Sequence, residues 1–306
     1  MSTASVSRGD LLGLTLAAAS WGVGTVISKR ALDEMPAITL LPIQLAASLV
    51  VLGILMRRQG MSLRGSPVLL GRLGILNPGL AYALGLLGLA TITASLAVLL
   101  WAAEPLMILA LAATFLHERI TPSLVFLSLV AVVGMILVIY DPASSGQWNG
   151  VVLTLTGVAC CAAYTVIARR LIATSDSTAQ VVFAQQAHAL GFAVIVVGAA
   201  ARVGGAVRPE NLTPLGLLSA VASGVLYYAG AYWLYLTALR RVPAALAAVS
   251  FYLIPIFGVA AGSLLLGERL DPRQWVGAII VLGALLMILR RPSMGPAAQP
   301  TAVPPI

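Results

Sequence analysis

The sequence is poor in charged residues, and this shortage decides its class. Asp, Glu, Lys and Arg together make up 9% of its 306 residues, whereas a soluble domain carries roughly 25%. Hydrophobic residues make up 60% of the chain, and the mean hydropathy is +1.00. So few charges cannot cover a surface that faces water. The composition therefore excludes a soluble globular protein and indicates an all-α integral membrane protein.

Histidine and cysteine are scarce, and a nucleotide-binding loop is absent. With two His and two Cys, the chain has neither an H-E-x-x-H motif nor a Cys–His cluster for a metal. It also lacks a G-x-x-x-x-G-K-[ST] loop, so ATP does not drive it directly. Cys160 and Cys161 are adjacent in an apolar run, a poor position for a structural disulfide. We expect no metal and no cofactor, and a membrane-embedded enzyme is only a remote alternative.

The net charge of +8 comes from arginines at the ends of apolar segments, with Lys29 as the single lysine. Positive charges in such positions set membrane orientation, so we expect a lipid bilayer as a partner and no nucleic acid. If both termini lie in the cytoplasm, Arg and Lys at the inner segment ends outnumber those at the outer ends two to one. The sequence therefore predicts a multi-pass protein of the bacterial cell inner membrane with cytoplasmic N- and C-termini.

Apolar segments long enough to cross a bilayer fill most of the chain. A helical span needs about 20 residues, and a helix satisfies its own backbone hydrogen bonds inside lipid. The connections are short, and the Pro- and Ala-rich residues 292–306 are expected to be a disordered tail. The sequence predicts ten transmembrane helices, at about 10–29, 37–56, 67–88, 91–114, 123–140, 150–168, 179–200, 213–238, 243–266 and 273–290.

Two halves of the chain repeat the same short phrases. "TVISKR" (25–30) recurs as "TVIARR" (165–170), and "LHERITP" (116–122) recurs as "LGERLDP" (266–272). Sliding the second phrase and its flanks onto the first by 150 positions also aligns Pro105 with Pro255. Apolar residues often match by chance in such an alignment, whereas a chance match of two prolines and a Glu-Arg pair is much less frequent. We interpret the chain as two repeats of one unit.

These repeats are expected to span residues 1–140 and 149–291, with five helices each. Because five is odd, the second repeat must enter the membrane from the opposite side to the first. Inverted repeats of this kind are common in secondary transporters, whose substrate site lies near the midplane between the halves. The predicted fold is therefore two inverted five-helix repeats around a central cavity.

The two Glu-Arg phrases have a structural and a functional interpretation. Glu118 with Arg119, and Glu268 with Arg269, can pair with each other or cap backbone groups at a helix end. The Pro that follows can start the next helix, where its missing N–H is not needed. Alternatively, the charges form an entrance that attracts a charged substrate. We favour the structural interpretation and do not place these residues in the substrate site.

The second of these regions resembles a known family. The run "ALRRVPAALAAVSFYLIPIFGVAAGSLLLGERLDPRQWVGAIIVLGALLMIL" (238–289), with its weaker echo at 91–139, is similar to the EamA domain of the drug/metabolite transporter superfamily. The resemblance covers both halves. It implies ten helices, inverted five-helix repeats and export of metabolites, and the similar bacterial subgroup exports aromatic and other neutral amino acids. The chain departs from the family pattern at His117, usually Gly, and at Glu104, which precedes the helix Pro.

An ionisable residue deep in a span is a functional candidate by default. Glu104 lies midway along the fourth segment and can bind an ammonium group or carry a coupling proton. Its alternative role is that of a neutral side chain bonded to carbonyls freed by Pro105. His188 lies midway along the seventh segment, on one face with Gln185. It is either a polar wall or proton relay, or a partner in an interhelical hydrogen bond.

Aromatic residues inside the spans suggest a cavity for an amphipathic organic solute. Trp101 shares a helix face with Glu104, and Tyr228 and Tyr232 lie on one face of the eighth segment. For each of these aromatics, packing is an alternative to substrate contact. The predicted substrate-binding residues are Trp21, Asn77, Tyr82, Trp101, Glu104, Tyr164, Gln185, His188, Tyr228, Tyr232 and Tyr252.

The sequence thus predicts a secondary exporter of small amphipathic metabolites, most of all aromatic and other neutral amino acids, that works by alternating access. A multidrug or other-metabolite exporter of the same superfamily is the alternative. A membrane receptor or scaffold is less favoured, because it has no need of two related conformations. We expect a monomer, since no long soluble surface is available for an obligate partner.

Overall fold

The computed structural model describes nearly all of the predicted membrane segments and several of their connections. Its described residues are 8–60, 68–116, 122–139, 147–172, 178–205, 207–209, 211–239, 250–251 and 253–289. Within these ranges the chain is helical with short connections, and no β-strand occurs. The prediction of an all-α protein is confirmed. The Glu-Arg phrase at 118–119, the tail at 292–306 and Tyr252 lie outside the described residues.

The first half contains three long helical stretches and two shorter ones. The third stretch changes helix type along its length, and the fourth breaks just before Glu104. The elements are α1 (Arg8–Leu32), α2 (Ala37–Arg58), α3 (Val68–Arg72), η1 (Leu73–Ile75), η2 (Leu76–Leu80), α4 (Ala81–Leu89), α5 (Ala94–Trp101), α6 (Glu104–Leu116) and α7 (Pro122–Ile139).

The second half follows a similar order. Pro122 starts α7 of the first half, and Pro214 and Pro272 start α10 and α14 of the second half, as expected for a residue that needs no helical N–H. The elements are α8 (Trp148–Ile172), α9 (Thr178–Arg202), α10 (Pro214–Ser223), η3 (Gly224–Gly230), α11 (Ala231–Leu239), α13 (Leu253–Leu266) and α14 (Pro272–Leu289).

Six stretches of the described chain are long and apolar enough to cross a membrane. They are Arg8–Leu32, Ala37–Arg58, Leu70–Leu89, Trp148–Ile167, Gln180–Arg202 and Pro214–Tyr235. Shorter apolar helices occur at Ala94–Ile108, Val125–Gly134 and Leu253–Leu266. The multi-pass character is therefore clear, while the count of ten helices stays a prediction.

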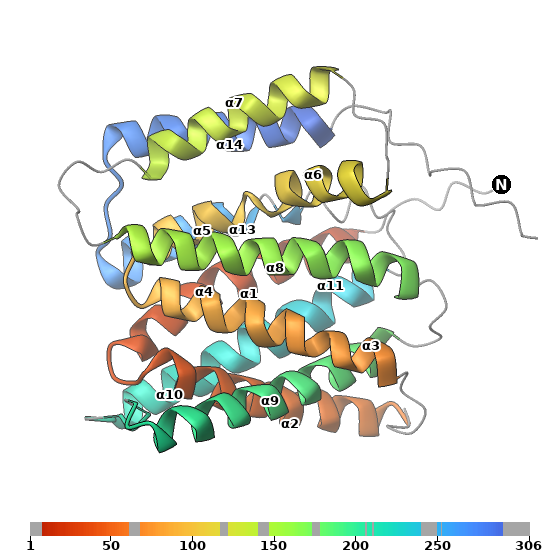
Figure 1. Cartoon of the computed structure of the whole chain (residues 1–306), viewed down its shortest axis with the longest axis vertical. Helices are drawn as coiled ribbons and strands as arrows, with labels where there is room; N and C mark the ends of the chain where they lie inside the picture. Colours follow the sequence, from red (N-terminus) through yellow and green to blue (C-terminus); the bar gives the residue numbers. More distant parts are fainter. Residues whose placement is uncertain are drawn as a thin grey trace, which may run out of the picture.

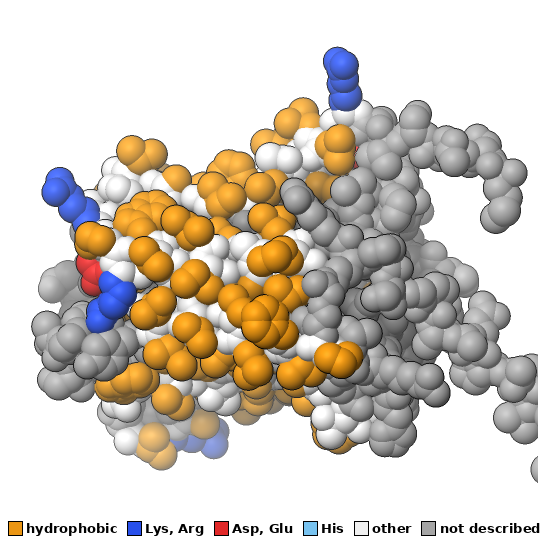
Figure 2. Space-filling model, turned by 90° about the horizontal axis from the view of Figure 1, so that it is seen from above, with side chains coloured by type: hydrophobic (Ala, Val, Ile, Leu, Met, Phe, Trp, Pro, Cys, Tyr) orange, Lys and Arg blue, Asp and Glu red, His pale blue; other side chains and the backbone are white. Residues whose placement is uncertain are grey.

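The outer surface of the bundle is apolar. Large side chains such as Phe126, Ile195 and Leu264 are 65%, 71% and 84% exposed, a pattern that water would penalise and lipid would not. Figure 2 shows one face largely covered by apolar side chains, with the Lys and Arg side chains at its edges. The molecule thus presents a lipid-facing belt with charges at its borders.

The helices pack in layers that run across Figure 1. Helix α1 lies inside the bundle and packs against α10, α11 and α13. Helices α2 and α9 pack together, as do α4 and α8. The last helices of the two halves, α7 and α14, lie side by side at one edge of the bundle (Figure 1).

Two glycines allow helices of different halves to approach closely. A Cβ at Gly224 would lie 2.6 Å from the Cα and the carbonyl oxygen of Gln44 on α2. A Cβ at Gly74 would overlap the backbone of Gln185 on α9 in the same way. Small residues of this kind replace the hydrophobic driving force that lipid does not provide. The two contacts join α2 to the second half and α9 to the first.

One Glu-Arg phrase has a defined structural role. The Glu268 carboxylate, between α13 and α14, accepts hydrogen bonds from the backbone N–H groups of Ala94 and Ser95 at 2.7 and 2.8 Å. It also accepts the Ser95 hydroxyl at 2.7 Å. These groups form the first turn of α5, whose unpaired N–H groups and dipole favour an anion. Of the two structural possibilities, capping is observed, and the capped helix belongs to the other half.

A second carboxylate joins the halves nearby. Glu34, in the α1–α2 connection, accepts the backbone N–H and the hydroxyl of Thr213 at 2.9 and 2.7 Å. Thr213 is the N-cap of α10. Arg30 donates to the same carboxylate at 2.8 Å. The hydrogen bonds from Thr213, and then Arg30, hold the pKa of Glu34 below its ordinary value of 4.5. We call Glu34, Glu268 and the groups they bind the carboxylate end.

Candidate functional site

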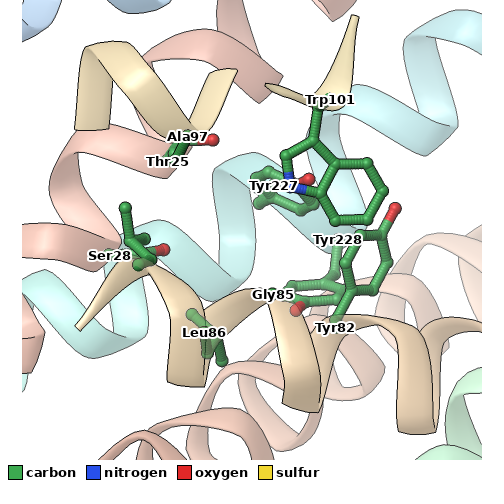
Figure 3. A pocket seen from close by; sticks show the side chains of 10 residues that line it. Thr25, Ser28, Tyr82, Gly85, Leu86, Ala97, Trp101, Tyr227 and Tyr228 are labelled. Carbon is green, nitrogen blue, oxygen red and sulfur yellow. The ribbon is translucent and has the colours of Figure 1, made fainter. Parts of the chain in front are cut away.

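A pocket lies among α1, α4, α5 and η3, so both halves of the chain contribute to it. Figure 3 shows the aromatic side chains gathered on one side of this pocket, with Thr25 and Ser28 on the other. The lining residues are Thr25, Ser28, Tyr82, Gly85, Leu86, Leu89, Ala97, Trp101, Tyr227 and Tyr228.

The pocket is small in this conformation. Its free volume is about 30 Å³, which is room for about two water molecules. Pockets for small organic ligands occupy roughly 300–1,000 Å³. An organic solute therefore requires the side chains and helices around the pocket to separate.

Tyr82 is the centre of the aromatic side. Its ring centroid lies 5.3 Å from that of Trp101 and 5.4 Å from those of Tyr227 and Tyr228. The last two pairs meet edge to face, a favourable geometry for aromatic rings. The Tyr82 hydroxyl also lies 3.2 Å from the Tyr232 hydroxyl. These two tyrosines are 150 positions apart, the same offset that aligns the Glu-Arg phrases.

Changes of helix type accompany the pocket tyrosines. The residues of η2 immediately precede α4, and Asn77 within it has the non-helical angles φ −144° and ψ 118°. Tyr227 and Tyr228 lie within the π-helical turn η3. A wider turn leaves carbonyl groups for other donors, and π-bulges often occur at functional sites. Gln186 on α9 donates to the carbonyl of Tyr228 at 3.0 Å.

The polar side of the pocket is backed by a buried hydrogen-bond network. Ser28 Oγ accepts from Gln44 Nε2 at 2.8 Å, and the same amide nitrogen donates to Ser223 Oγ at 2.8 Å. The network joins α1 and α2 to α10 of the other half. A second pair, Ser48 and Gln186, is linked at 2.5 Å. Each of these five residues is at most 3% exposed.

Glu104 is the first residue of α6, directly after the break that ends α5 at Trp101. Its carboxyl oxygen accepts a hydrogen bond from the thiol of Cys161 on α8 at 3.1 Å. No Lys, Arg or His pairs with it among the described residues. Because the helix breaks between them, Trp101 and Glu104 do not share a helix face in the simple way that their spacing predicts. Trp101 lines the pocket, and Glu104 does not.

Trp21 and Tyr232 belong to a neighbouring aromatic group. The Trp21 ring lies 5.5 Å from Tyr232, 5.7 Å from Tyr235 and 5.4 Å from Phe251, measured between centroids. Trp21 does not line the pocket. Tyr232 touches this group on one side and Tyr82 on the other, so it connects the two groups.

The remaining predicted residues lie around α9. Tyr164 donates to Gln185 Oε1 at 3.0 Å, which links α8 to α9. His188 Nδ1 lies 2.8 Å from the carbonyl oxygen of Ala184 on its own helix. Asn77 is buried at the kink in η2. None of these four lines the pocket.

Tyr227, Thr25 and Ser28 line the pocket although they are not among the predicted binding residues. Thr25 and Ser28 lie on the helix face of Trp21, so the sequence carried a signal for them. Tyr227 carried none, because the spacing of Tyr228, Tyr232 and Tyr235 favoured a single α-helical face. The wider turn of η3 allows the adjacent residues Tyr227 and Tyr228 both to reach the pocket.

Comparisons with known proteins agree with this architecture. An "Uncharacterized transporter" of Archaeoglobus fulgidus is 27% identical over 204 residues, which are 67% of this chain and 68% of that protein. The "Uncharacterized transporter YwfM" of Bacillus subtilis is 33% identical over 91 residues, or 30% of this chain and 29% of that protein. A solved crystal structure covers 93% of this chain with a TM-score of 0.63 and 16% identity, which shows a shared fold.

The family model for the EamA-like transporter family matches the chain twice, at residues 7–140 and 148–290. The two matches together cover nearly the whole chain. The apolar outer surface, the helical bundle and the pocket between its halves agree with such a protein. The chain therefore belongs to the EamA-like transporter family, within the drug/metabolite transporter superfamily.

Proposed function

We propose that the protein is a secondary transporter that exports small amphipathic metabolites, most of all aromatic and other neutral amino acids, by alternating access. The observation that carries this proposal is the aromatic pocket to which both halves contribute. Four aromatic side chains on one side and two hydroxyl groups on the other match a solute with an apolar body and a polar head. A site shared between halves is also where a rocking motion changes access.

The two matches to one family model, the contact between Tyr82 and Tyr232, and the paired contacts of Gly74 and Gly224 support an inverted-repeat arrangement. Two-fold related halves place matching residues against each other at the axis. On this proposal the repeats span 1–140 and 149–291, and the protein works as a monomer in the inner membrane of a bacterium. Single cysteines at positions 34 and 60, labelled from one side at a time, test the orientation with cytoplasmic termini.

Flux measurements test the transport proposal. Purified protein in proteoliposomes should release preloaded labelled phenylalanine or tryptophan faster than protein-free vesicles do. Trp101→Ala should reduce this flux at least tenfold, because it removes a ring that lines the pocket. Phe126→Ala is the matched control, since it removes a ring that is 65% exposed on α7. Equal loss in both variants, or no flux of any solute by the parent, contradicts the proposal.

A multidrug or other-metabolite exporter is the second candidate. The observation that favours it is that no Lys, Arg or His occurs among the ten lining residues to pair with the carboxylate of an amino acid. Cells that express the protein should be exposed to toxic amino-acid analogues and to cationic drugs. Resistance to the analogues alone supports amino-acid export, and resistance to the drugs alone selects this alternative.

Glu104 is the proposed site of proton coupling. Among the described residues, the Glu104 carboxyl group is bonded only to the thiol of Cys161. A carboxylate with so weak a partner is poorly stabilised inside a membrane, so this group is suited to binding and releasing a proton. Glu104→Gln should retain flux down a substrate gradient and lose the acceleration that an imposed pH gradient gives the parent. If parent and variant respond to the pH gradient alike, Glu104 does not carry the coupling proton.

A further inference from the structure

The two aliphatic hydroxyl groups of the pocket, those of Thr25 and Ser28, have already used their protons. Thr25 Oγ1 donates to the carbonyl of Trp21 at 3.0 Å, and Ser28 Oγ donates to the carbonyl of Gly24 at 2.8 Å. A hydroxyl has one proton to donate and two lone pairs that accept. Toward the pocket, Thr25 and Ser28 therefore offer acceptors only.

The side-chain amide of Gln44, which bonds to Ser28, has also used its hydrogens. Gln44 Nε2 uses both hydrogens, on Ser28 Oγ and on Ser223 Oγ. Its Oε1 has no hydrogen-bond partner among the described residues, although the side chain is 0% exposed. An unsatisfied buried acceptor is costly. The network behind Ser28 thus contains an unused acceptor, and the hydrogen bonds of the described residues use every donor of Ser28, Gln44 and Ser223.

The charge of the lining residues also favours a positively charged ligand. No Lys, Arg or His is found among its ten lining residues, all of which the structure describes. A desolvated carboxylate would have no cationic partner here, and it would find no free donor on Thr25 or Ser28. The faces of Tyr and Trp rings attract a cation, and the attraction increases when water is excluded.

We propose that the side of the pocket formed by Thr25 and Ser28 is a subsite for a protonated amine, so that the protein recognises its substrate by an ammonium group and not by a carboxylate. The inference rests on the proposed transport function, because it assigns a chemical group to that same pocket. The two hydroxyl oxygens accept the N–H groups, and the aromatic side chains enclose the apolar body. Phenethylamine should then bind at least as well as phenylalanine.

Equilibrium binding tests this subsite independently of transport. Quenching of tryptophan fluorescence in the purified full chain should be titrated with phenethylamine, 2-phenylethanol and 3-phenylpropionate, which share a phenyl body and differ in the head group. We expect phenethylamine to bind at least tenfold more tightly than 3-phenylpropionate, with 2-phenylethanol between them. Equal binding of the amine and the acid, or no binding of the amine, overturns the inference. Loss of the signal in Trp101→Phe would locate the reporter in the pocket.

Variants separate recognition from a general loss of structure. Thr25→Val and Ser28→Ala each remove an acceptor and should lower the ratio of amine to alcohol affinity about tenfold. Thr156→Val is the matched control, because the Thr156 hydroxyl makes the same bond to its own helix, to the carbonyl of Val152 at 2.7 Å, on an exposed face. A structural defect would weaken amine and alcohol alike and leave their ratio unchanged. An unchanged ratio in both pocket variants contradicts the subsite.

The flux and binding experiments distinguish failure of the transport proposal from failure of the amine subsite. If phenethylamine binds selectively but no solute crosses proteoliposomes, the transport proposal fails and the subsite stands. If phenylalanine crosses and 3-phenylpropionate binds as tightly as phenethylamine, transport stands and the subsite fails.

Discussion

The carboxylates of Glu34 and Glu268, at the carboxylate end, and the carboxylate of Glu104 have opposite hydrogen-bonding environments. Glu268 accepts three hydrogen bonds from the first turn of α5, and Glu34 is held by Thr213 and Arg30. Glu104, the first residue of α6, is bonded to a thiol among the described residues. A carboxylate that accepts several hydrogen bonds from another helix holds the helices together. One that lacks them is available for exchange with a proton or a cation.

The largest effect is expected at Glu268. Glu268→Gln removes the charge from the start of α5 and leaves at most one oxygen for three donors, which should lower the free energy of unfolding by about 2 kcal/mol. Thermal unfolding in detergent measures this loss. The neighbouring Arg269→Gln, at an exposed position, is the matched control. Similar losses in the two variants would show that charge at this turn, and not capping, is what matters.

Acid should weaken the second link, at Glu34. Because its pKa lies below 4.5 in the folded protein, Glu34 stabilises the structure above that pH, and the contribution disappears as the pH falls through the lowered pKa. The difference in melting temperature between the parent and Glu34→Gln should therefore be full near neutral pH and shrink below pH 4.5. A difference that is constant across this range contradicts the link.

Arg30 should matter less than either carboxylate. Its guanidinium is 36% exposed and pairs with Glu34 four residues along, and such surface pairs contribute about 0.2–1 kcal/mol. Arg30→Gln should lower stability by this amount at low salt and by less at high salt. A loss as large as that of Glu268→Gln would mean that Arg30 has a role beyond this pair.

The smallest change in stability is expected at Glu104. Glu104→Gln replaces a group that the described structure bonds to a single weak donor, so the melting temperature should change by no more than about 2 °C, equivalent to a few tenths of a kcal/mol. Its effect on the response of flux to a pH gradient should be large by contrast. A large loss of stability would place Glu104 with the carboxylates that hold helices together, and the comparison would fail.

The sequence alone predicts the class of the fold better than it predicts the partners of individual residues. Apolar runs and the absence of charge are local properties, and the helices confirm them. The Glu-Arg phrase predicted capping as one possibility, but the capped helix begins 174 residues before Glu268. Nothing in the local sequence names such a distant partner.

The residues that line the pocket could be predicted only in part, because their positions also depend on segments distant in the sequence. Tyr82, Trp101 and Tyr228 line the pocket, because large aromatics in mid-span must pack inside or meet a ligand. Tyr227 was overlooked, since the spacing rule assumes an α-helix and η3 is a π-helical turn. Trp21 shares a face with Thr25 and Ser28 but packs against Tyr232, Tyr235 and Phe251. Which side of a helix faces a cavity is decided by neighbours that the helix itself does not encode.

The small volume of the pocket has a consequence for speed. A solute much larger than two water molecules enters only after the rings around Tyr82 have moved apart. If the protein transports by alternating access as proposed, the maximum rate at saturating concentration is set by how often the helices open, and solutes of unequal size should share it. Size would instead change the concentration at which that rate is reached.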